Sequence, residues 1–191
     1  GPYSYLFESV QGGEKWGRYS IIGLPARSRL EISGSECREI VDGTTVRSEQ
    51  VSDPLAEVAA YRARFKVAER ADLPRFNGGL VGYFGYDTVR YVEPKLAHCP
   101  NPETVETPDI CLLLSDEVVV FDNLAGKLYL LIYVDPTATT TLRQAWELAR
   151  TRLDALVEGL QSQLPELPQS APTQVRETDF ISGFGRDGFE Q

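Results

Sequence analysis

The first half of the chain alternates apolar runs with short polar breaks, a pattern typical of strands joined by turns. The predicted strands cover residues 5–10, 18–32, 37–41, 45–51, 80–86, 110–121 and 127–134. Asp42 and Gly43 separate two of these runs and predict a tight hairpin turn. A hairpin loop is expected at residues 122–126, between the last two strands.

Two segments show the three- and four-residue spacing of an amphipathic helix. In the first, Asp53 is placed to cap the helix and Pro54 suits its first position. Its apolar face recurs at Leu55, Val58, Tyr61 and Phe65. The second stripe, at residues 142–160, fits a coiled-coil seam or a helix packed on a sheet, of which the latter is commoner. A shorter helical turn is predicted between Asp87, as its cap, and Pro94, which stops it.

The order of these elements indicates an α+β fold with largely antiparallel β-sheets and two main helices packed on them. Strands and helices do not alternate regularly, which disfavours a doubly wound parallel sheet. Beyond the last helix the periodicity ends and prolines recur. We therefore expect one domain at residues 1–162, followed by a proline-rich linker at 163–178.

Composition and charge narrow the function classes. With 42% hydrophobic residues the chain has the composition of a soluble globular protein. Its formal net charge of −9 and the lack of a basic cluster disfavour nucleic acid as a partner. No apolar run approaches the ~18 residues of a membrane span. Cys37, Cys99 and Cys111 form no C-x-x-C pair, so we expect free thiols that act as small hydrophobes in the cytoplasm.

The sequence shows no motif that would supply catalytic or metal-binding residues. His98 is the only histidine, and a zinc site takes about four nitrogen or sulfur ligands. A surface-loop role is the simpler interpretation of His98. The glycines of residues 79–85 lack the Lys-Ser/Thr of a phosphate loop. They are better explained by close approach of a neighbouring backbone.

An acidic residue in the first strand is the main candidate for a binding role. Strand alternation places Glu8 on one face with Leu6, and Ser9 on the other. One interpretation is a cross-strand ion pair between Glu8 and Arg18. The other is a pocket formed by Glu8, Ser9 and residues 18–20, in which the carboxylate receives an ammonium and the arginine receives a carboxylate. The residues alone favour the ion pair.

Two long motifs carry a resemblance to a known family. Residues 6–23, LFESVQGGEKWGRYSIIG, and residues 76–87, FNGGLVGYFGYD, closely resemble the amino-terminal region of anthranilate synthase component I. The segment Pro108-Asp109-Ile110 is also similar, so the resemblance covers nearly the whole chain. The chain opens without a methionine, and we expect it to be part of a longer protein.

The resemblance implies conversion of chorismate to anthranilate and pyruvate, with ammonia from a glutamine amidotransferase subunit, component II, and with Mg²⁺. In this family the catalytic and metal-binding residues belong to the carboxy-terminal chorismate-binding domain, the start of which resembles residues 179–191. We therefore expect no catalytic residue, metal site or cofactor in this chain. We expect it to lack catalytic activity by itself.

The resemblance also implies a feedback site for tryptophan. The family's Leu-Leu-Glu-Ser element matches residues 6–9, with Phe7 in place of a leucine, and its basic residue aligns with Arg18. The expected effector-binding residues are Leu6, Phe7, Glu8, Ser9, Arg18, Tyr19 and Ser20. In the family, a strand of the chorismate-binding domain completes this site.

Two alternatives stay open on the sequence. Aminodeoxychorismate synthase component I shares the architecture and the glycine-rich strand, although residues 12–20 favour anthranilate synthase. A stand-alone amino-acid-binding or scaffold domain without an enzymatic partner is the other alternative.

Overall fold

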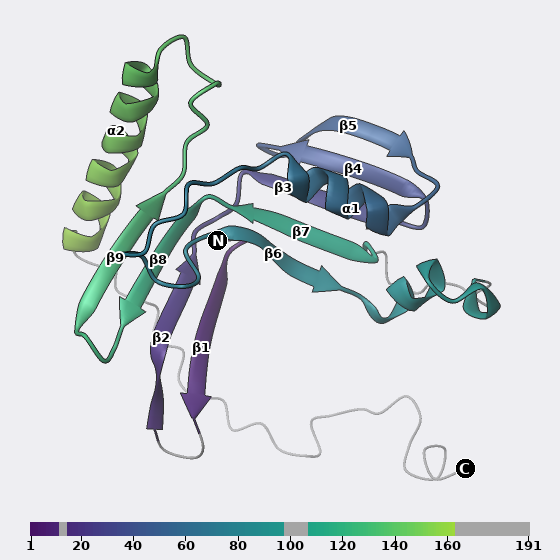
Figure 1. Ribbon diagram of the computed structural model, residues 1–191, viewed down its shortest axis with the longest axis horizontal. Coiled ribbons are helices and arrows are strands. Elements are labelled where there is room, and N and C mark those ends of the chain that lie inside the picture. The colour runs from purple at the N-terminus through teal and green to yellow at the C-terminus, as the bar shows by residue number, and fades with distance from the viewer. Residues whose placement is uncertain (12–14, 98–106, 163–191) are drawn as a thin grey trace, which may run out of the picture. The chain divides into compact units, whose positions relative to one another are not determined.

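The computed structural model describes residues 1–11, 15–97 and 107–162, with the backbone alone at residues 9–11, 15 and 16 (Figure 1). The chain divides into two units, Gly1–Val157 and Glu158–Gln191. The predicted linker at residues 163–178 and the segment 179–191 lie outside the described residues.

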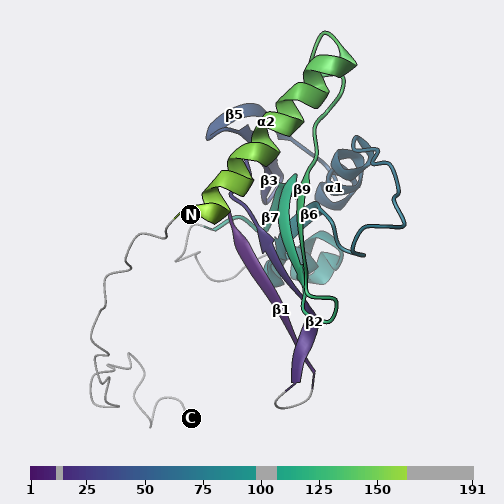
Figure 2. The same ribbon diagram turned by 90° about the vertical axis from the view of Figure 1, so that its left-hand side faces the viewer.

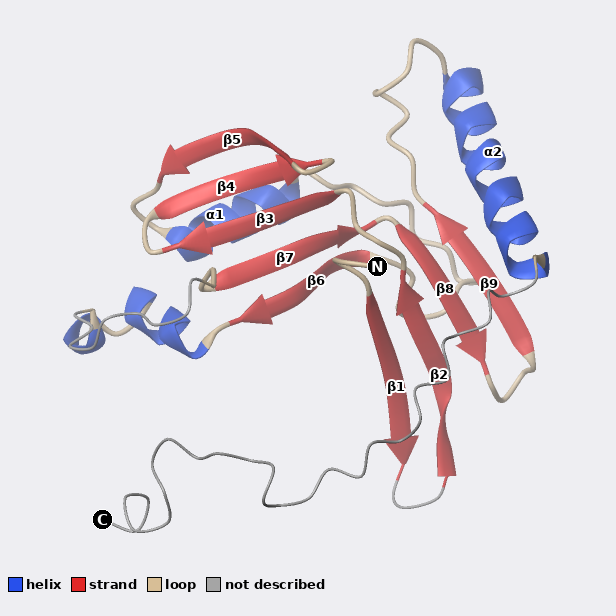
Figure 3. Ribbon diagram, turned by 180° about the vertical axis from the view of Figure 1, so that it is seen from behind, coloured by secondary structure: helices blue, strands red, loops and turns tan. Residues whose placement is uncertain are grey.

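The described strands form two antiparallel sheets, which confirms the predicted α+β class (Figure 3). The four-stranded sheet has the order β1 (Tyr5–Gln11), β2 (Lys15–Gly23), β8 (Glu117–Asp122) and β9 (Lys127–Ile132). The five-stranded sheet has the order β5 (Thr44–Gln50), β4 (Glu36–Val41), β3 (Ser28–Ser33), β7 (Ile110–Ser115) and β6 (Gly79–Phe84). The helices are α1 (Pro54–Ala63), α2 (Leu142–Gln161) and the short 3₁₀ turns η1 (Tyr86–Tyr91) and η2 (Pro94–Leu96).

Two of the predicted strands are wrong, because each predicted run contains two separate strands that belong to different sheets. Residues 18–32 form β2 and β3, and residues 110–121 form β7 and β8. The apolar pattern runs across both breaks because the strands on either side are apolar. Arg27 in one connection and Asp116 in the other form an ion pair of 3.0 Å, which joins the two crossing points.

The predicted hairpin turn at Asp42 and Gly43 and the predicted helix cap at Asp53 are both confirmed. Asp42 and Gly43 have φ values of +49° and +79°, and Val41 pairs with Thr44 across them. Two positive φ values in a two-residue connection are the signature of a type I′ hairpin. The Asp53 side chain accepts a hydrogen bond of 2.9 Å from the backbone N–H of Ala56, as expected of an N-cap.

The predicted cap of the short helical turn is wrong. Gly85 precedes η1, and the Thr88 hydroxyl donates a 2.7 Å hydrogen bond to its carbonyl. Asp87 instead accepts a hydrogen bond of 2.8 Å from Nε of Arg90. Pro94 begins η2 rather than ending the helical segment, because its fixed φ suits the first position of a helical turn.

The core of the five-stranded sheet lies under α1. Its fully buried cluster consists of Leu30, Ile32, Cys37, Tyr61, Ile110 and Leu112. A Cβ at Gly82 of β6 would lie 1.8 Å from the carbonyl oxygen of Cys111, so the prediction of close backbone approach is confirmed there. Cys37 and Cys111 are free thiols, and burial raises the pKa of both. Cys99 lies outside the described residues.

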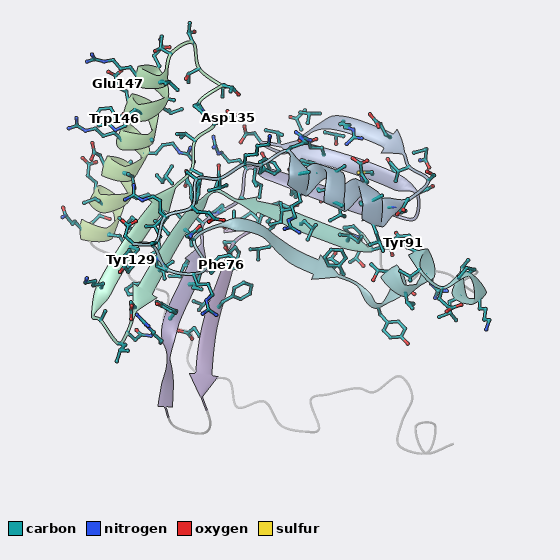
Figure 4. The ribbon with its side chains drawn as sticks, in the orientation of Figure 1. Phe76, Tyr91, Tyr129, Asp135, Trp146 and Glu147 are labelled. Atoms are coloured by element: carbon teal, nitrogen blue, oxygen red, sulfur yellow. The ribbon has the colours of Figure 1, made fainter. Side chains whose placement is uncertain are left out.

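Helix α2 lies beside β9 and β8 (Figures 1 and 2). Nε of Arg152 donates a 2.7 Å hydrogen bond to Glu117 at the start of β8, and Ala145 is 4% exposed. The apolar stripe is only partly covered, because Leu142 and Trp146 remain exposed (Figure 4).

Candidate functional site

The expected effector-binding residues meet on two paired strands. β1 is an edge strand of the four-stranded sheet and pairs with β2 (Figure 3). Residues 6, 7 and 8 lie opposite residues 22, 21 and 20, so Glu8 faces Ser20 across the pair. Antiparallel pairing thus brings residues 6–9 and 18–20 side by side.

The pairing is irregular at the centre of the candidate site. Glu8 pairs with Ser20 and Val10 pairs with Trp16, so residues 17–19 lie opposite Ser9 alone. Extra residues in one strand form a β-bulge, which bends that strand and re-aims its side chains. The bulge contains Arg18, one of the expected effector-binding residues.

The Glu8 carboxylate is exposed on the sheet. Its neighbour Leu6, two residues earlier on the same face, is also exposed. No hydrogen bond or ion pair joins Glu8 to any side chain that the structure describes. The cation expected opposite this carboxylate is therefore not supplied by the described residues.

Arg18 binds Asp122 of β8 instead of Glu8. Its Nε lies 3.2 Å from Oδ1 and its Nη2 lies 2.9 Å from Oδ2 of Asp122. The guanidinium also lies 4.8 Å from the centre of the Tyr19 ring. The hydrogen bonds from Arg18 lower the pKa of the Asp122 carboxyl below its usual range. The interpretation of a Glu8–Arg18 ion pair is therefore wrong.

The turn after β8 also holds the backbone of β2. The backbone N–H of Asn123 donates to the carbonyl of Arg18 at 2.8 Å, and its side-chain amide donates to the carbonyl of Gly17 at 3.1 Å. Asp122 accepts a further hydrogen bond of 3.0 Å from the N–H of Ala125. The sequence indicated only a hairpin loop here. Asp-Asn after an apolar strand is a turn signal, but it does not identify the strand that the turn contacts.

Among the other expected residues, Leu6 and Phe7 provide exposed apolar surface. Leu6 is 57% exposed and Phe7 49% exposed, while Tyr19 and Ser20 are half-buried. Ser9 lies within β1, and its side chain is outside the described part of the structure. An exposed leucine on the same face as the exposed Glu8 carboxylate, with a guanidinium on the next strand, suits a ligand with an apolar body and both charges.

The side chains and helices of residues 1–11, 15–97 and 107–162 bear on two other functions, metal binding and membrane insertion. No cluster of three or more His, Cys, Asp and Glu side chains there has the arrangement of a metal site. Within the same residues, no helix has the length and apolar character needed to cross a membrane. His98 lies outside this part of the chain.

No family model matches the chain. The fold resembles part of anthranilate synthase component I. The crystal structure of component I from Streptococcus pneumoniae superposes with a TM-score of 0.59 at 20% identity, over 82% of this chain and 32% of that one.

Curated relatives over nearly the whole chain are named anthranilate synthase component 1. Those from Pseudomonas putida, Pseudomonas aeruginosa and Neisseria meningitidis are 50%, 49% and 41% identical, each over 99% of this chain. The chain belongs to the anthranilate synthase component 1 family and corresponds to its amino-terminal region. It spans 38% of the length of these relatives. The relatives do not favour aminodeoxychorismate synthase.

Proposed function

We propose that the full-length protein containing this chain is the chorismate-utilising component of anthranilate synthase in tryptophan biosynthesis. It would release pyruvate from chorismate and form anthranilate, with ammonia from a glutamine amidotransferase subunit, in the cytoplasm. The family name shared by relatives at 41–50% identity supports this proposal. By the resemblance to the family, Mg²⁺ and the catalytic residues would belong to the chorismate-binding domain of the full-length protein.

The role proposed for this chain is feedback binding of tryptophan at β1 and β2. Glu8 would receive the ammonium group of the ligand, Arg18 its carboxylate, and Leu6 and Phe7 would contact the indole. The observation that carries this assignment is the exposed Glu8 carboxylate without a described cationic partner, paired across the sheet with Ser20 beside the bulge at Arg18. Burial of an indole adds about 2–3 kcal/mol of favourable free energy.

The position of β1 also supports a site shared with the chorismate-binding domain. Within the described residues β1 pairs with β2 on one side only, so its other edge has free backbone hydrogen-bonding groups. A strand from the chorismate-binding domain would cover Leu6 and Phe7 and close the site around the ligand. Such a shared site lets tryptophan change the contact between the two domains, with a coupling of about 1–3 kcal/mol.

The test is inhibition of anthranilate formation by tryptophan in the full-length enzyme. Ser9→Leu and Glu8→Ala should each raise the tryptophan concentration that halves the variant's own rate by about tenfold or more. Glu158→Ala, which removes an exposed carboxylate from α2, is the matched control and should leave that concentration unchanged. Inhibition that stays at the wild-type level in both site variants would contradict the assignment.

The proposal that this chain is not catalytic by itself has a separate test. The 191-residue chain alone should leave chorismate unconsumed, with or without Mg²⁺, when the substrate is followed by its absorbance. Measurable turnover by this chain would contradict the placement of catalysis in the chorismate-binding domain.

A further inference from the structure

We propose that Asp122, at the end of β8, is a positioning residue of the effector site: it holds the Arg18 guanidinium so that one edge stays open for the carboxylate of the ligand. The inference rests on the function proposed above, because it takes the β1–β2 site as the place where tryptophan binds.

Within the described residues, one edge of the Arg18 guanidinium is bound and the other edge is open. Asp122 occupies Nε and Nη2 of Arg18, at 3.2 and 2.9 Å. No acceptor within the described residues binds Nη1. An arginine presents its donors in a rigid planar fork, so fixing one edge also fixes the direction of the other. The open edge can then bind a second carboxylate with little further loss of side-chain freedom.

Asp122 is buried and Arg18 is exposed, as expected of a positioning residue and of the ligand-binding arginine that it holds. The Asp122 side chain is 3% exposed, whereas the Arg18 side chain is 54% exposed. The carboxylate is further fixed by the backbone N–H of Ala125. The buried acid therefore acts as the fixed partner, and the guanidinium that it holds reaches the surface where a ligand can contact it.

The residue after Asp122 fixes the backbone that carries Arg18. Asn123 binds the carbonyls of Arg18 and Gly17, and its side-chain amide lies 3.4 Å from the hydroxyl of Ser20. Both sides of the bulge opposite Ser9 are thus attached to the β8 turn. Side chain and backbone of Arg18 are both held by two consecutive residues, Asp122 and Asn123, from a strand more than 100 positions away.

Three ligands separate the two charged contacts in the full-length protein. Tryptophan carries both charges, tryptamine lacks the carboxylate, and indole-3-propionate lacks the ammonium group. Calorimetric titration should show that Asp122→Asn weakens tryptophan and indole-3-propionate by about tenfold or more and leaves tryptamine unchanged. Glu8→Gln should show the opposite selectivity and weaken tryptophan and tryptamine only.

A double-mutant comparison tests whether Asp122 acts through Arg18. In an Arg18→Gln background, Asp122→Asn should cause no further loss of indole-3-propionate affinity. Asp116→Asn, which breaks the similar ion pair with Arg27 before β8, is the matched control and should leave all three affinities unchanged. Asp122→Glu keeps the charge and should bind indole-3-propionate more tightly than Asp122→Asn does. If Asp122→Asn does not fold, Asp122→Glu is compared with the wild type and should weaken tryptophan and indole-3-propionate but not tryptamine, because the longer side chain shifts the guanidinium that it holds.

The outcomes separate this inference from the function on which it rests. If Glu8→Gln leaves tryptophan affinity unchanged, the site itself is wrongly assigned. If Glu8→Gln weakens tryptophan but Asp122→Asn weakens all three ligands equally, Asp122 has a structural role only and the inference is overturned. An equal loss on Asp122→Asn with and without Arg18 also overturns it.

Discussion

The hydroxyl oxygens of Tyr5 and Ser115 lie 2.7 Å apart and join the first strand of the four-stranded sheet to the last residue of β7 in the five-stranded sheet. The Tyr5 ring occupies the space beside Gly23 on β2, where a Cβ would lie 1.9 Å from a ring carbon. Burial raises the pKa of the Tyr5 hydroxyl above its ordinary value. The start of the proposed effector strand is therefore anchored to both sheets.

Removal of this anchor should destabilise the fold. Tyr5→Phe leaves the buried Ser115 hydroxyl, which belongs to a residue 2% exposed, without its partner. We expect a loss of about 1 kcal/mol in the free energy of unfolding, measured by chemical denaturation. Tyr3→Phe removes a hydroxyl from an exposed ring and should change this free energy little. Equal effects of the two substitutions would contradict the anchoring role.

Replacement of Tyr61 by phenylalanine should have the opposite effect. The Tyr61 hydroxyl is buried and has no hydrogen-bond partner among the residues that the structure describes, and burial raises its pKa to about 12. Loss of an unsatisfied buried hydroxyl removes a cost of about 1–3 kcal/mol. Tyr61→Phe should therefore leave the protein as stable as the wild type or more stable. Destabilisation by more than about 1 kcal/mol would show that the hydroxyl does have a partner.

Gly82 is expected to tolerate no side chain. A Cβ there would lie 1.8 Å from the Cys111 carbonyl oxygen, a backbone atom that cannot move without disturbing the pairing of β6 with β7. Gly82→Ala should lower the free energy of unfolding by more than about 3 kcal/mol. The matched control is Gly159→Ala in α2, where the added Cβ meets no atom within 4 Å. This variant should be neutral or slightly more stable, since alanine favours helix.

The ion pair between Arg18 and Asp122 should make stability fall in acid. The pKa of Asp122 is lower in the folded protein than its ordinary value of 3.8, chiefly because of the hydrogen bonds from Arg18. The folded state thus binds the proton less readily than the unfolded state, so the stabilisation is present above about pH 4 and is lost as the pH falls through the folded value. Denaturation at several pH values should show a smaller acid-induced loss in Asp122→Asn than in the wild type. Identical pH profiles would contradict the pairing.

The parts of the fold that depend only on residues close together in the sequence could be predicted from it. The Asp42-Gly43 turn and the Asp53 cap follow from backbone geometry within a few residues. The breaks at residues 24–27 and at Asp116 could not, because an apolar run looks the same whether its strand stays in one sheet or passes into another.

For the candidate site as well, some features could be predicted from the sequence and the long-range contacts could not. Alternation and the resemblance placed residues 6–9 and 18–20 side by side, and the observed pairing of Glu8 with Ser20 agrees with that arrangement. The partner of Arg18 could not be predicted, because Asp122 becomes its neighbour only when β8 pairs with β2, 104 residues away. The bulge opposite Ser9 was also missed, since it changes a register that the sequence pattern treats as regular.

Calorimetric titration of tryptophan into the full-length protein tests the central claim most directly, with the wild type and Glu8→Ala compared at the same pH. The account predicts saturable binding by the wild type and an affinity at least about tenfold lower for Glu8→Ala. Equal affinities for the two proteins, or the absence of binding to the wild type, would contradict the assignment of β1 and β2 as the effector site.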